Sequence, residues 1–404
     1  MAVADCFRPG TAADRVDGEV PPQVAEPDSP EAFAGVLAYA TAERLATVMR
    51  GGGTKLSWGR RPDNLDLVVS TTRLTRLIAH RHGDLTATVQ AGMTLRDLNV
   101  ALSAERQWLP IDSAFDHATI GGIVATNDAG PSRHRHGTPR DLIIGITLAL
   151  TDGRLVKAGG TVVKNVAGYD LGKLVSGSHG TLAGIVDVTF KLVPVPQTSA
   201  TLVASYVEPG ALARDVAALD ASQIEPAAFD IRSEDGETPL QLKLRVATSP
   251  AARDAQIAAA RALVSGQATV LTDSAERETW QAQLDAPWHG DAAVRLSWLP
   301  TKLLNVLEML SEIQRTDRAS VTFVGRVIGT GLARLSGDVR GLAAAIQRLR
   351  SSDDVGNVVL LRGSRELKET VDVWGVPRSS DSAVRSLKRM FDPAGILNAD
   401  RGPI

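Results

Sequence analysis

The chain has 404 residues, of which 44% are hydrophobic and 22% charged, and its formal net charge is −2. This composition is that of an ordinary globular protein, and the length allows two or three domains. The small net charge and the 4% of aromatic residues argue against a nucleic-acid-binding surface. The single cysteine, Cys6, excludes a disulfide framework, an iron–sulfur cluster held by this chain and a multi-cysteine zinc site.

Nothing in the sequence predicts a membrane segment or a secretory signal. No apolar run approaches the roughly 20 residues that span a bilayer, and the N-terminal run contains acids but no apolar core. We therefore expect a cytoplasmic protein that reaches an inner membrane only through partner subunits. Residues 1–28 are rich in Ala, Pro, Gly and acids without a hydrophobic period, which predicts a disordered or loosely docked tail.

Short elements are predicted for residues 29–197. Ser29 directly before Pro30 indicates a helix N-terminus, because Ser favours the cap position and Pro the first helical position. Apolar alternation and turn residues predict the strands 47–49, 65–70, 86–90, 142–150, 155–158 and 185–193. Periodicity predicts further helices at 74–78, 95–105 and 119–127.

From residue 198 onward, strands alternate with longer helices, and no sequence repeat is evident. The predicted strands are 202–206, 242–247, 293–298, 321–328 and 358–362. The predicted helices are 211–219, 251–264, 301–314, 339–351 and 382–391. This order predicts a smaller α+β domain at 198–404, with a ferredoxin-like sheet and helices on one face, after a first domain at 29–197.

The first of three glycine-rich segments, residues 50–55, follows a predicted strand. Successive glycines let backbone N–H groups converge on an anion, and the hydroxyl of Thr54 adds a donor. The spacing differs from that of a P-loop, and no GxGxxG fingerprint opens a helix in this sequence. A flexible surface turn is the alternative explanation.

The second glycine segment, residues 110–130, has Gly121 and Gly122 at the start of a predicted helix. The N-terminal amides of such a helix would face a phosphate. Two short hydroxyl side chains, Ser113 and Thr119, flank this position. Close packing of the helix against a strand is the alternative explanation for the two glycines.

The third glycine segment, residues 158–194, contains seven glycines and ends in the predicted strand 185–193. Such glycine density indicates backbone that approaches a ligand closely or turns with positive φ. Lys164, Asn165 and Asp170 interrupt its apolar background, and solvated turn residues are the alternative explanation for them. Three such segments in one domain favour an extended ligand with a diphosphate over three unrelated turns.

In combination, the three segments resemble the FAD-binding domain of the vanillyl-alcohol-oxidase and p-cresol-methylhydroxylase family. The resemblance covers residues 28–197 and is closed by Pro194-Val-Pro196. The motifs that carry it are Arg50-Gly-Gly-Gly-Thr54, Thr119-Ile-Gly-Gly122, Ala125-Thr-Asn127 with Gly130, and Gly168-Tyr-Asp-Leu171 continued by Gly177-Ser178-His-Gly180-Thr-Leu182.

Within this family, the chain resembles the E subunits of bacterial glycolate oxidases (glycolate dehydrogenases). This likeness is carried by Gly160-Thr-Val-Val-Lys164-Asn-Val-Ala-Gly-Tyr-Asp-Leu171, together with Gly130-Pro131, Arg133, Gly137 and Arg140-Asp141. The run 390–398, MFDPAGILN, also resembles the last element of the family. It departs from that element at Ala399-Asp400, where proline and glycine are usual.

The resemblance implies a two-subdomain FAD-binding domain of the p-cresol-methylhydroxylase (PCMH) type. It places the pyrophosphate on Gly51–Thr54 and the Gly121-Gly122 turn, the adenine and ribityl parts along Gly177–Ile185, and the isoalloxazine toward the second domain. Relatives with covalent flavin carry a histidine in the first glycine loop, and this chain has none between Arg50 and Trp58, so we expect noncovalent FAD. The implied cofactor-binding residues are Arg50, Gly51, Gly52, Gly53, Thr54, Ser113, Thr119, Gly121, Gly122, Thr126, Asn127, Gly130, Gly177, Ser178, Gly180, Thr181 and Ile185.

The sequence leaves the catalytic residues unassigned. Oxidation of a 2-hydroxy acid requires a base for the hydroxyl proton and cations for the carboxylate. In the related catalytic D subunits, histidines of the second domain bind a metal. Here only His289 of the seven histidines lies beyond residue 197, so no metal site is predicted.

The other histidine candidates are the pair His134 and His136, and His179. His134 and His136 would share one face of a strand. A surface or partner-facing loop, a flavin or substrate contact, and a metal site are the alternatives for this pair. His179 lies within the flavin element, so a position near the flavin is expected for it rather than a catalytic role.

The resemblance implies the FAD-binding subunit of a multi-subunit glycolate oxidase, which oxidises glycolate to glyoxylate or relays the electrons of that reaction. The implied partners are a catalytic flavoprotein D subunit and an iron–sulfur F subunit. One alternative is a self-sufficient FAD-linked oxidase of another hydroxy acid or an alditol. Another is a noncatalytic flavin-binding subunit that serves assembly.

Overall fold

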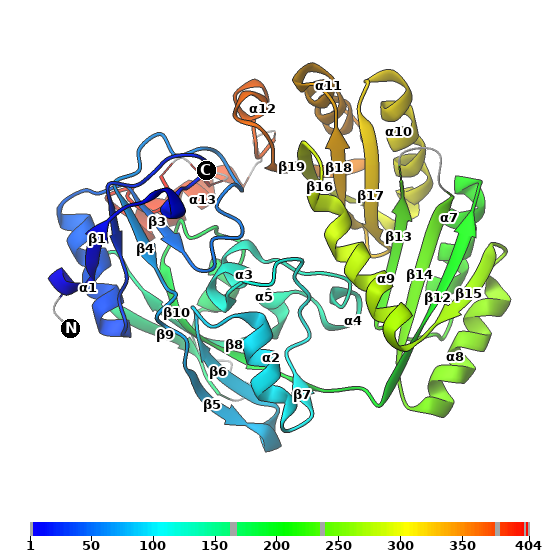
Figure 1. Cartoon of the computed structure of the whole chain (residues 1–404), viewed down its shortest axis with the longest axis horizontal. Helices are drawn as coiled ribbons and strands as arrows, with labels where there is room; N and C mark the ends of the chain where they lie inside the picture. The colour runs from blue at the N-terminus through cyan, green and yellow to red at the C-terminus, as the bar shows by residue number, and fades with distance from the viewer. Residues whose placement is uncertain (1–2, 162–167, 235–238, 376–379, 400, 403–404) are drawn as a thin grey trace. The chain divides into compact units, whose positions relative to one another are not determined.

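The computed structural model describes residues 3–161, 168–234, 239–375, 380–399 and 401–402. Lys164 and Asn165 of the third glycine segment lie outside the described residues. The chain divides into two compact units, each of which combines helices with sheets, so the predicted α+β class is confirmed (Figure 1). Unit 1 consists of Met1–Ala129, Gly137–Val195 and Pro377–Ile404, and unit 2 of Gly130–His136 and Pro196–Val376.

A four-stranded sheet forms one subdomain of unit 1. Its order is β1 (Phe7–Pro9), β2 (Gln23–Ala25), β4 (Leu67–Ser70) and β3 (Thr47–Arg50), and β2 and β3 both run parallel to β4. Helix α1 (Pro30–Ala42) shares a buried apolar cluster with β2 and β4. The helix begins as predicted, because Ser29 Oγ accepts a hydrogen bond from the Ala32 amide over 3.2 Å.

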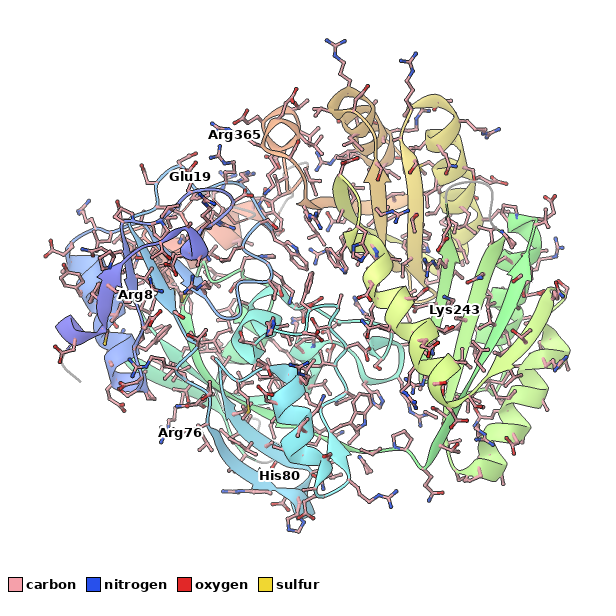
Figure 2. The ribbon with its side chains drawn as sticks, in the orientation of Figure 1. Arg8, Glu19, Arg76, His80, Lys243 and Arg365 are labelled. Carbon is pink, nitrogen blue, oxygen red and sulfur yellow. The ribbon has the colours of Figure 1, made fainter. Side chains whose placement is uncertain are left out.

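The N-terminal residues take part in this sheet instead of forming the predicted disordered or loosely docked tail. β1 pairs antiparallel with β2, and the side chain of Val24 is fully buried. Arg8, labelled in Figure 2, donates to Asp14 Oδ2 over 2.8 Å and to Glu26 Oε1 over 2.7 Å. Pairing with β4, more than forty residues further along the chain, orders a segment whose own composition lacks a hydrophobic period.

A five-stranded antiparallel sheet forms the other subdomain of unit 1. Its order is β5 (Leu77–Arg81), β6 (Thr86–Gln90), β10 (Gly184–Lys191), β8 (Ile143–Ala149) and β9 (Leu155–Gly159). The predicted helix at 74–78 is wrong, because Leu77 begins β5 and pairs with Val89. The core of the subdomain contains residues of this sheet and of helices α2 (Leu95–Ser103) and α3 (Ile120–Thr126).

The C-terminal segment, residues 392–399 and 401, also belongs to unit 1, although the sequence placed it with the second domain. It follows helix α13 (Asp381–Phe391), and Leu397 forms a parallel bridge with Thr47 of β3. The Thr47 amide donates to the Ile396 carbonyl over 2.8 Å. The remaining elements of unit 1 are β7 (Gln107–Trp108), β11 (Val193–Pro194), α5 (Pro139–Leu142) and α6 (Leu171–Val175).

Unit 2 contains an eight-stranded antiparallel sheet made of two successive βαββαβ halves. The sheet order is β15-β12-β14-β13-β17-β18-β16-β19, so each half has the strand order of a ferredoxin-like fold and the halves meet where β13 pairs with β17. The first half is β12 (Thr198–Tyr206), α7 (Pro209–Asp220), β13 (Ala228–Ser233), β14 (Leu240–Thr248), α8 (Pro250–Leu263) and β15 (Gln267–Leu271). The second is β16 (Ala292–Trp298), α10 (Leu303–Thr316), β17 (Ser320–Arg326), β18 (Thr330–Ser336), α11 (Val339–Arg350) and β19 (Val355–Arg362).

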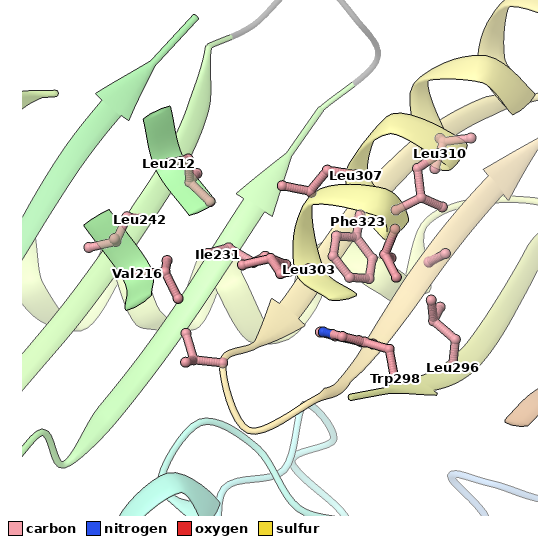
Figure 3. Packing of buried hydrophobic residues seen from close by; sticks show 14 of the residues in the cluster. Leu212, Val216, Ile231, Leu242, Leu296, Trp298, Leu303, Leu307, Leu310 and Phe323 are labelled. Carbon is pink, nitrogen blue, oxygen red and sulfur yellow. The ribbon is translucent and has the colours of Figure 1, made fainter. Parts of the chain in front are cut away.

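One apolar core lies between this sheet and the helices α7, α8, α10 and α11 (Figure 3). Leu212 of α7 and Leu307 of α10 pack in this core with Leu242, Ile231 and Phe323 of the sheet. A further helix, α9 (Asp273–Asp285), lies on the opposite face, so the prediction of helices on one face is incomplete. Elsewhere in unit 2 are the short helices α4 (Arg133–His136) and α12 (Arg365–Thr370).

Polar contacts hold α9 on its face of the sheet. Trp280 Nε1 donates to Thr201 Oγ1 over 2.8 Å, and the Thr201 hydroxyl is 2.9 Å from Glu276 Oε1. Because side chains alternate along a strand, Thr201 points away from its neighbours Ala200 and Leu202, which lie in the apolar core. Among the described residues, no helix is long and apolar enough to cross a membrane.

Candidate functional site

The three glycine segments meet in unit 1 around one pocket. Parts of the pocket come from β3 and the loop after it, from α3, from the loop before β10 and from the C-terminal segment. The predicted cofactor-binding residues that line it are Arg50, Gly51, Gly52, Gly53, Thr54, Thr119, Gly121, Gly122, Thr126, Gly180 and Ile185.

The first glycine segment passes so close to neighbouring chain that side chains would not fit. A Cβ at Gly52 would lie 1.7 Å from the His117 carbonyl oxygen, and one at Gly51 would lie 1.9 Å from Thr119 Oγ1. Gly53 has a φ of +74°, a conformation that favours glycine. The segment is therefore a tightly packed wall of the pocket rather than a flexible surface turn.

Ion pairs hold both ends of this segment. Arg50 Nη1 donates to Asp14 Oδ1 over 2.7 Å, and Arg8 on the other side of Asp14 helps to keep the pKa of that carboxyl well below its usual range. Lys55 Nζ lies 2.8 Å from Asp128 Oδ2, and the lysine side chain is only 7% exposed. These pairs fix the segment while partly neutralising its two cations.

Aromatic rings and the C-terminal segment complete this end of the pocket. Lys55 Nζ is 5.6 Å from the ring centroid of Trp58 and 5.3 Å from that of Phe115, within cation–π range. Arg401 Nη2 donates to the Leu56 carbonyl over 2.6 Å and to the Trp58 carbonyl over 2.8 Å. Burial lowers the pKa of Arg401 to about 10, which leaves the guanidinium charged at neutral pH.

The two glycines of α3 have different structural causes. A Cβ at Gly121 would lie 2.9 Å from Ala91 Cβ, so close packing against the end of β6 requires this glycine. A Cβ at Gly122 would meet only Thr119 Oγ1, at 3.4 Å. Packing within the protein therefore explains Gly121, whereas the space beside Gly122 belongs to the pocket.

The third glycine segment reaches the pocket at a turn of left-handed backbone. His179 has a φ of 54° and Gly180 one of 71°. The His179 amide donates to the Ala125 carbonyl of α3 over 2.8 Å, which joins the second and third glycine segments. His179, Gly180, Ala183 and Ile185 then line the pocket on the way into β10.

Six predicted cofactor-binding residues do not line this pocket, and most of them have clear structural partners. Ser113 Oγ donates to Asp128 Oδ2 over 3.2 Å, and Asn127 ends α3 in a left-handed conformation while Oδ1 accepts from the Arg140 amide. Gly130 belongs to unit 2, where its carbonyl accepts from Arg326 Nε over 3.2 Å. The residues outside the lining are Ser113, Asn127, Gly130, Gly177, Ser178 and Thr181.

Sequence reasoning missed several pocket residues. Lys55 is the last residue of the first glycine segment and Trp58 lies three residues further along, so their proximity to the glycines was the available signal. Asn398 and Arg401 come from the far end of the chain. The only sequence signal there was the resemblance of residues 390–398 to the last element of the family. Two buried side-chain oxygens in the lining, Thr119 Oγ1 and Asn398 Oδ1, have no hydrogen-bond partner within the described part of the chain. Such atoms fit a ligand that carries hydrogen-bonding groups.

The histidine pair does not form the arrangement predicted for it. Arg133–His136 is the single-turn helix α4, in which residues two apart point to different sides, so the predicted shared strand face is wrong. The His134 ring packs edge-on against Phe229 with 5.9 Å between ring centroids, and burial lowers the pKa of this imidazole. No group of three or more His, Cys, Asp or Glu side chains suited to a metal occurs in the described ranges of the chain.

Unit 2 has its own buried polar cluster on the sheet face that carries α9. Lys243, labelled in Figure 2, donates from Nζ to Gln283 Oε1 of α9 over 3.1 Å. Burial lowers the pKa of Lys243 to about 8. On the same face, Arg245 Nε lies 3.0 Å from Glu276 Oε1, and Glu276 is 3% exposed. These contacts hold α9 against the sheet.

Comparison with known proteins agrees with the geometry of the pocket. Residues 21–159 match the family model described as FAD binding domain. The chain is 34% identical over 212 residues to glycolate oxidase subunit GlcD of Bacillus subtilis and 35% over 202 residues to a D-lactate dehydrogenase of Archaeoglobus fulgidus. It is 32% identical over 179 residues to glycolate oxidase subunit GlcE of Escherichia coli.

These alignments cover only part of each protein. They include 52%, 48% and 44% of this chain, in the order given, and 45%, 45% and 51% of the relatives. The chain thus spans about half the length of the curated relatives it matches. A solved structure of alkyldihydroxyacetonephosphate synthase matches 94% of this chain and 76% of its own chain, with a TM-score of 0.70. At 16% identity, that likeness concerns the fold alone. Residues 21–159 of the chain are therefore similar to the FAD binding domain that this family model describes.

Proposed function

We propose that the chain is the FAD-binding subunit of a multi-subunit glycolate oxidase or dehydrogenase. The observation that carries the proposal is the pocket that the three glycine segments build together. The identity of 32% over 179 residues to glycolate oxidase subunit GlcE of Escherichia coli supports the choice of complex. A catalytic flavoprotein subunit and an iron–sulfur subunit are the partners that this proposal implies.

The residues of the pocket fit FAD. The backbone of Gly51–Thr54 and the space beside Gly122 would take the pyrophosphate, because no side chain fills that space. The buried hydroxyl of Thr119 would bond the same group. The turn at His179 and Gly180 and the strand residue Ile185 would hold the adenine and ribityl parts. The absence of histidine between Arg50 and Trp58 supports noncovalent attachment.

The chemistry that FAD supplies when bound is the acceptance of two electrons from the carbon that bears the substrate hydroxyl. Glycolate then loses two electrons and two protons and becomes glyoxylate. The protein's contribution, from the residues described, is to bind and orient the flavin. Arg50 and Lys55 bring positive charge to the pyrophosphate end of the pocket, and Asp14 and Asp128 keep those side chains in place.

A second substrate is favoured by the other relatives. The chain is 35% identical over 202 residues to a D-lactate dehydrogenase and 36% over 180 residues to a D-2-hydroxyglutarate dehydrogenase of Xanthomonas citri. Both names refer to acids that share the 2-hydroxy carboxylate group of glycolate. A flavin-linked oxidation of another 2-hydroxy acid by this chain is therefore the alternative.

The test begins with the purified chain reconstituted with FAD, alone and with the presumed partner subunits. Glycolate, D-lactate and D-2-hydroxyglutarate are added separately under anaerobic conditions, and flavin absorbance near 450 nm is followed. Bleaching only when partners are present supports a relay or assembly role within the complex. Bleaching of the isolated chain by D-lactate but not by glycolate supports the alternative. A wild-type chain that binds no flavin would overturn the whole proposal.

A further inference from the structure

The C-terminal segment places one polar side chain in the FAD pocket. Asn398 is 8% exposed and lines the pocket beside His179 and Gly180. Its Nδ2 donates to the His179 carbonyl, whereas Oδ1 is buried and has no hydrogen-bond partner among the described residues. This contact fixes the orientation of the carboxamide. The His179 carbonyl oxygen can only accept a hydrogen bond, so the NH₂ group and not Oδ1 must face it.

The backbone that carries Asn398 is held on several sides. Its amide donates to the Thr47 carbonyl over 2.8 Å, and its φ of 43° turns the chain back after the pairing with β3. Lys388 Nζ donates to the Leu397 carbonyl over 2.8 Å and to the Thr181 carbonyl over 2.9 Å. The fully buried carboxylate of Asp392 accepts the Leu397 amide over 2.8 Å. The backbone that carries the carboxamide is therefore held at the pocket by contacts with β3, Lys388 and Asp392.

The side of the Asn398 carboxamide that carries Nδ2 faces Gly180 and Met49. A Cβ at Gly180 would lie 2.9 Å from Asn398 Nδ2 and 3.1 Å from Met49 Cε, so the neighbours on that side are a glycine and an apolar methyl group. A buried carbonyl oxygen without a partner costs folding free energy. A donor supplied by a ligand in the pocket would remove that cost.

We propose that Asn398 Oδ1 accepts a hydrogen bond from a hydroxyl or amine group of bound FAD. The C-terminal segment is then part of the cofactor site, and Asn398 is a positioning residue for the flavin. This inference rests on the proposed binding of FAD and adds to it a contact from outside the three glycine segments.

The test compares FAD affinity and folding stability in three full-length variants. Asn398→Leu removes both polar atoms at similar size. Asn398→Ser removes the carboxamide oxygen and shortens the side chain, while its hydroxyl keeps a polar group at this position. Lys388→Met is the matched control, because it loosens the same segment without removing a pocket residue. Flavin fluorescence gives the Kd of each apoprotein for FAD, and urea unfolding without FAD gives its stability.

We expect Asn398→Leu and Asn398→Ser each to raise the Kd for FAD about tenfold, as loss of one buried hydrogen bond to a ligand does. Lys388→Met should lower the stability of the apoprotein and raise the Kd less. Equal Kd values for wild type and both Asn398 variants would overturn the contact. So would a rise in Kd that Lys388→Met reproduces, because the effect would then come from docking of the segment. If Asn398→Leu fails to fold, the Kd of Asn398→Ser for FAD tests the contact. If the wild type binds no FAD, the proposed function is contradicted, and not only this contact.

Discussion

Lys55 Nζ lies 2.8 Å from Asp128 Oδ2, and this buried ion pair joins the first glycine segment to the second. The lysine side chain is 7% exposed and the aspartate side chain 15%. Because water reaches neither charge well, the opposite charge of the partner stabilises each of them. The position of one pocket wall relative to the other thus depends on this pair.

Lys55→Met should destabilise the protein by about 3 kcal/mol, because it leaves Asp128 buried without its cation. Asp128→Asn should cost a similar amount, and the double variant should cost clearly less than the sum of the two. Urea unfolding of the four proteins gives the coupling free energy. Additive effects would show that the two side chains do not depend on each other.

Gly122→Ala separates flavin binding from folding. The new methyl group meets only Thr119 Oγ1 at 3.4 Å, and alanine favours a helix over glycine by up to about 1 kcal/mol. The apoprotein should therefore be as stable as wild type or more so, while the Kd for FAD rises about tenfold or more. Gly121→Ala is the matched control and should destabilise the apoprotein, because its methyl group would meet Ala91 at 2.9 Å. Unchanged flavin affinity in Gly122→Ala would place the pyrophosphate elsewhere.

Asp14→Asn should lower stability at pH 7 by about 2 kcal/mol, since Arg8 and Arg50 lose their shared carboxylate. The pKa of Asp14 is lowered in the folded state by hydrogen bonds from Arg8 and Thr11. Its contribution is therefore present above the ordinary pKa of 3.8 and is lost as the pH falls further toward the folded-state value.

The difference in unfolding free energy between wild type and Asp14→Asn should accordingly be constant from pH 7 to 5 and shrink below pH 4. Asp152→Asn removes an exposed pair with Arg154 and should change stability by less than about 1 kcal/mol. A difference for Asp14→Asn that persists unchanged at pH 3 would contradict this assignment.

Lys243 predicts a pH dependence of the same sign at higher pH. Burial lowers its folded-state pKa to about 8 from 10.5, so the unfolded chain binds more protons between these values. Stability should therefore rise with pH from 8 to 10.5, with a slope of up to about 1.4 kcal/mol per pH unit from this group. Lys243→Met should remove this slope. Lys302→Met is the control, because the Lys302 side chain is 44% exposed, and it should leave the slope of stability against pH unchanged. Urea unfolding of the wild type and the two variants at pH 7.5 to 10.5 measures these slopes.

Local patterns predicted much of the fold. Ser29 caps helix α1 where expected, because a helix start depends on side-chain and backbone atoms within one turn. The strands β8 and β10 were visible as apolar runs next to turns. The glycine segments could be recognised in the sequence because the backbone there lies very close to neighbouring chain. At positions such as Gly52 only glycine fits.

Features that depend on distant partners were missed. The N-terminal residues have no hydrophobic period, and their order comes from parallel pairing with β4. Helix α9 is polar, and its side chains Glu276, Trp280 and Gln283 contact the sheet. Its sequence therefore has no apolar stripe from which a helix could be predicted. Asn398 enters the pocket from the other end of the chain, and no local pattern assigns a lone asparagine to a site.

The pairing of Leu397 with Thr47 has a consequence for biosynthesis. Thr47 and Leu397 are about 350 residues apart in the chain. Because a ribosome adds roughly 5 to 20 residues per second, Leu397 is synthesised some 20 to 70 seconds after β3. Unit 2 is synthesised in between, and its two βαββαβ halves rely on short-range pairings that can form while translation continues. A nascent chain stalled before residue 392 would thus carry a finished unit 2 and a unit 1 that still lacks one wall of its pocket.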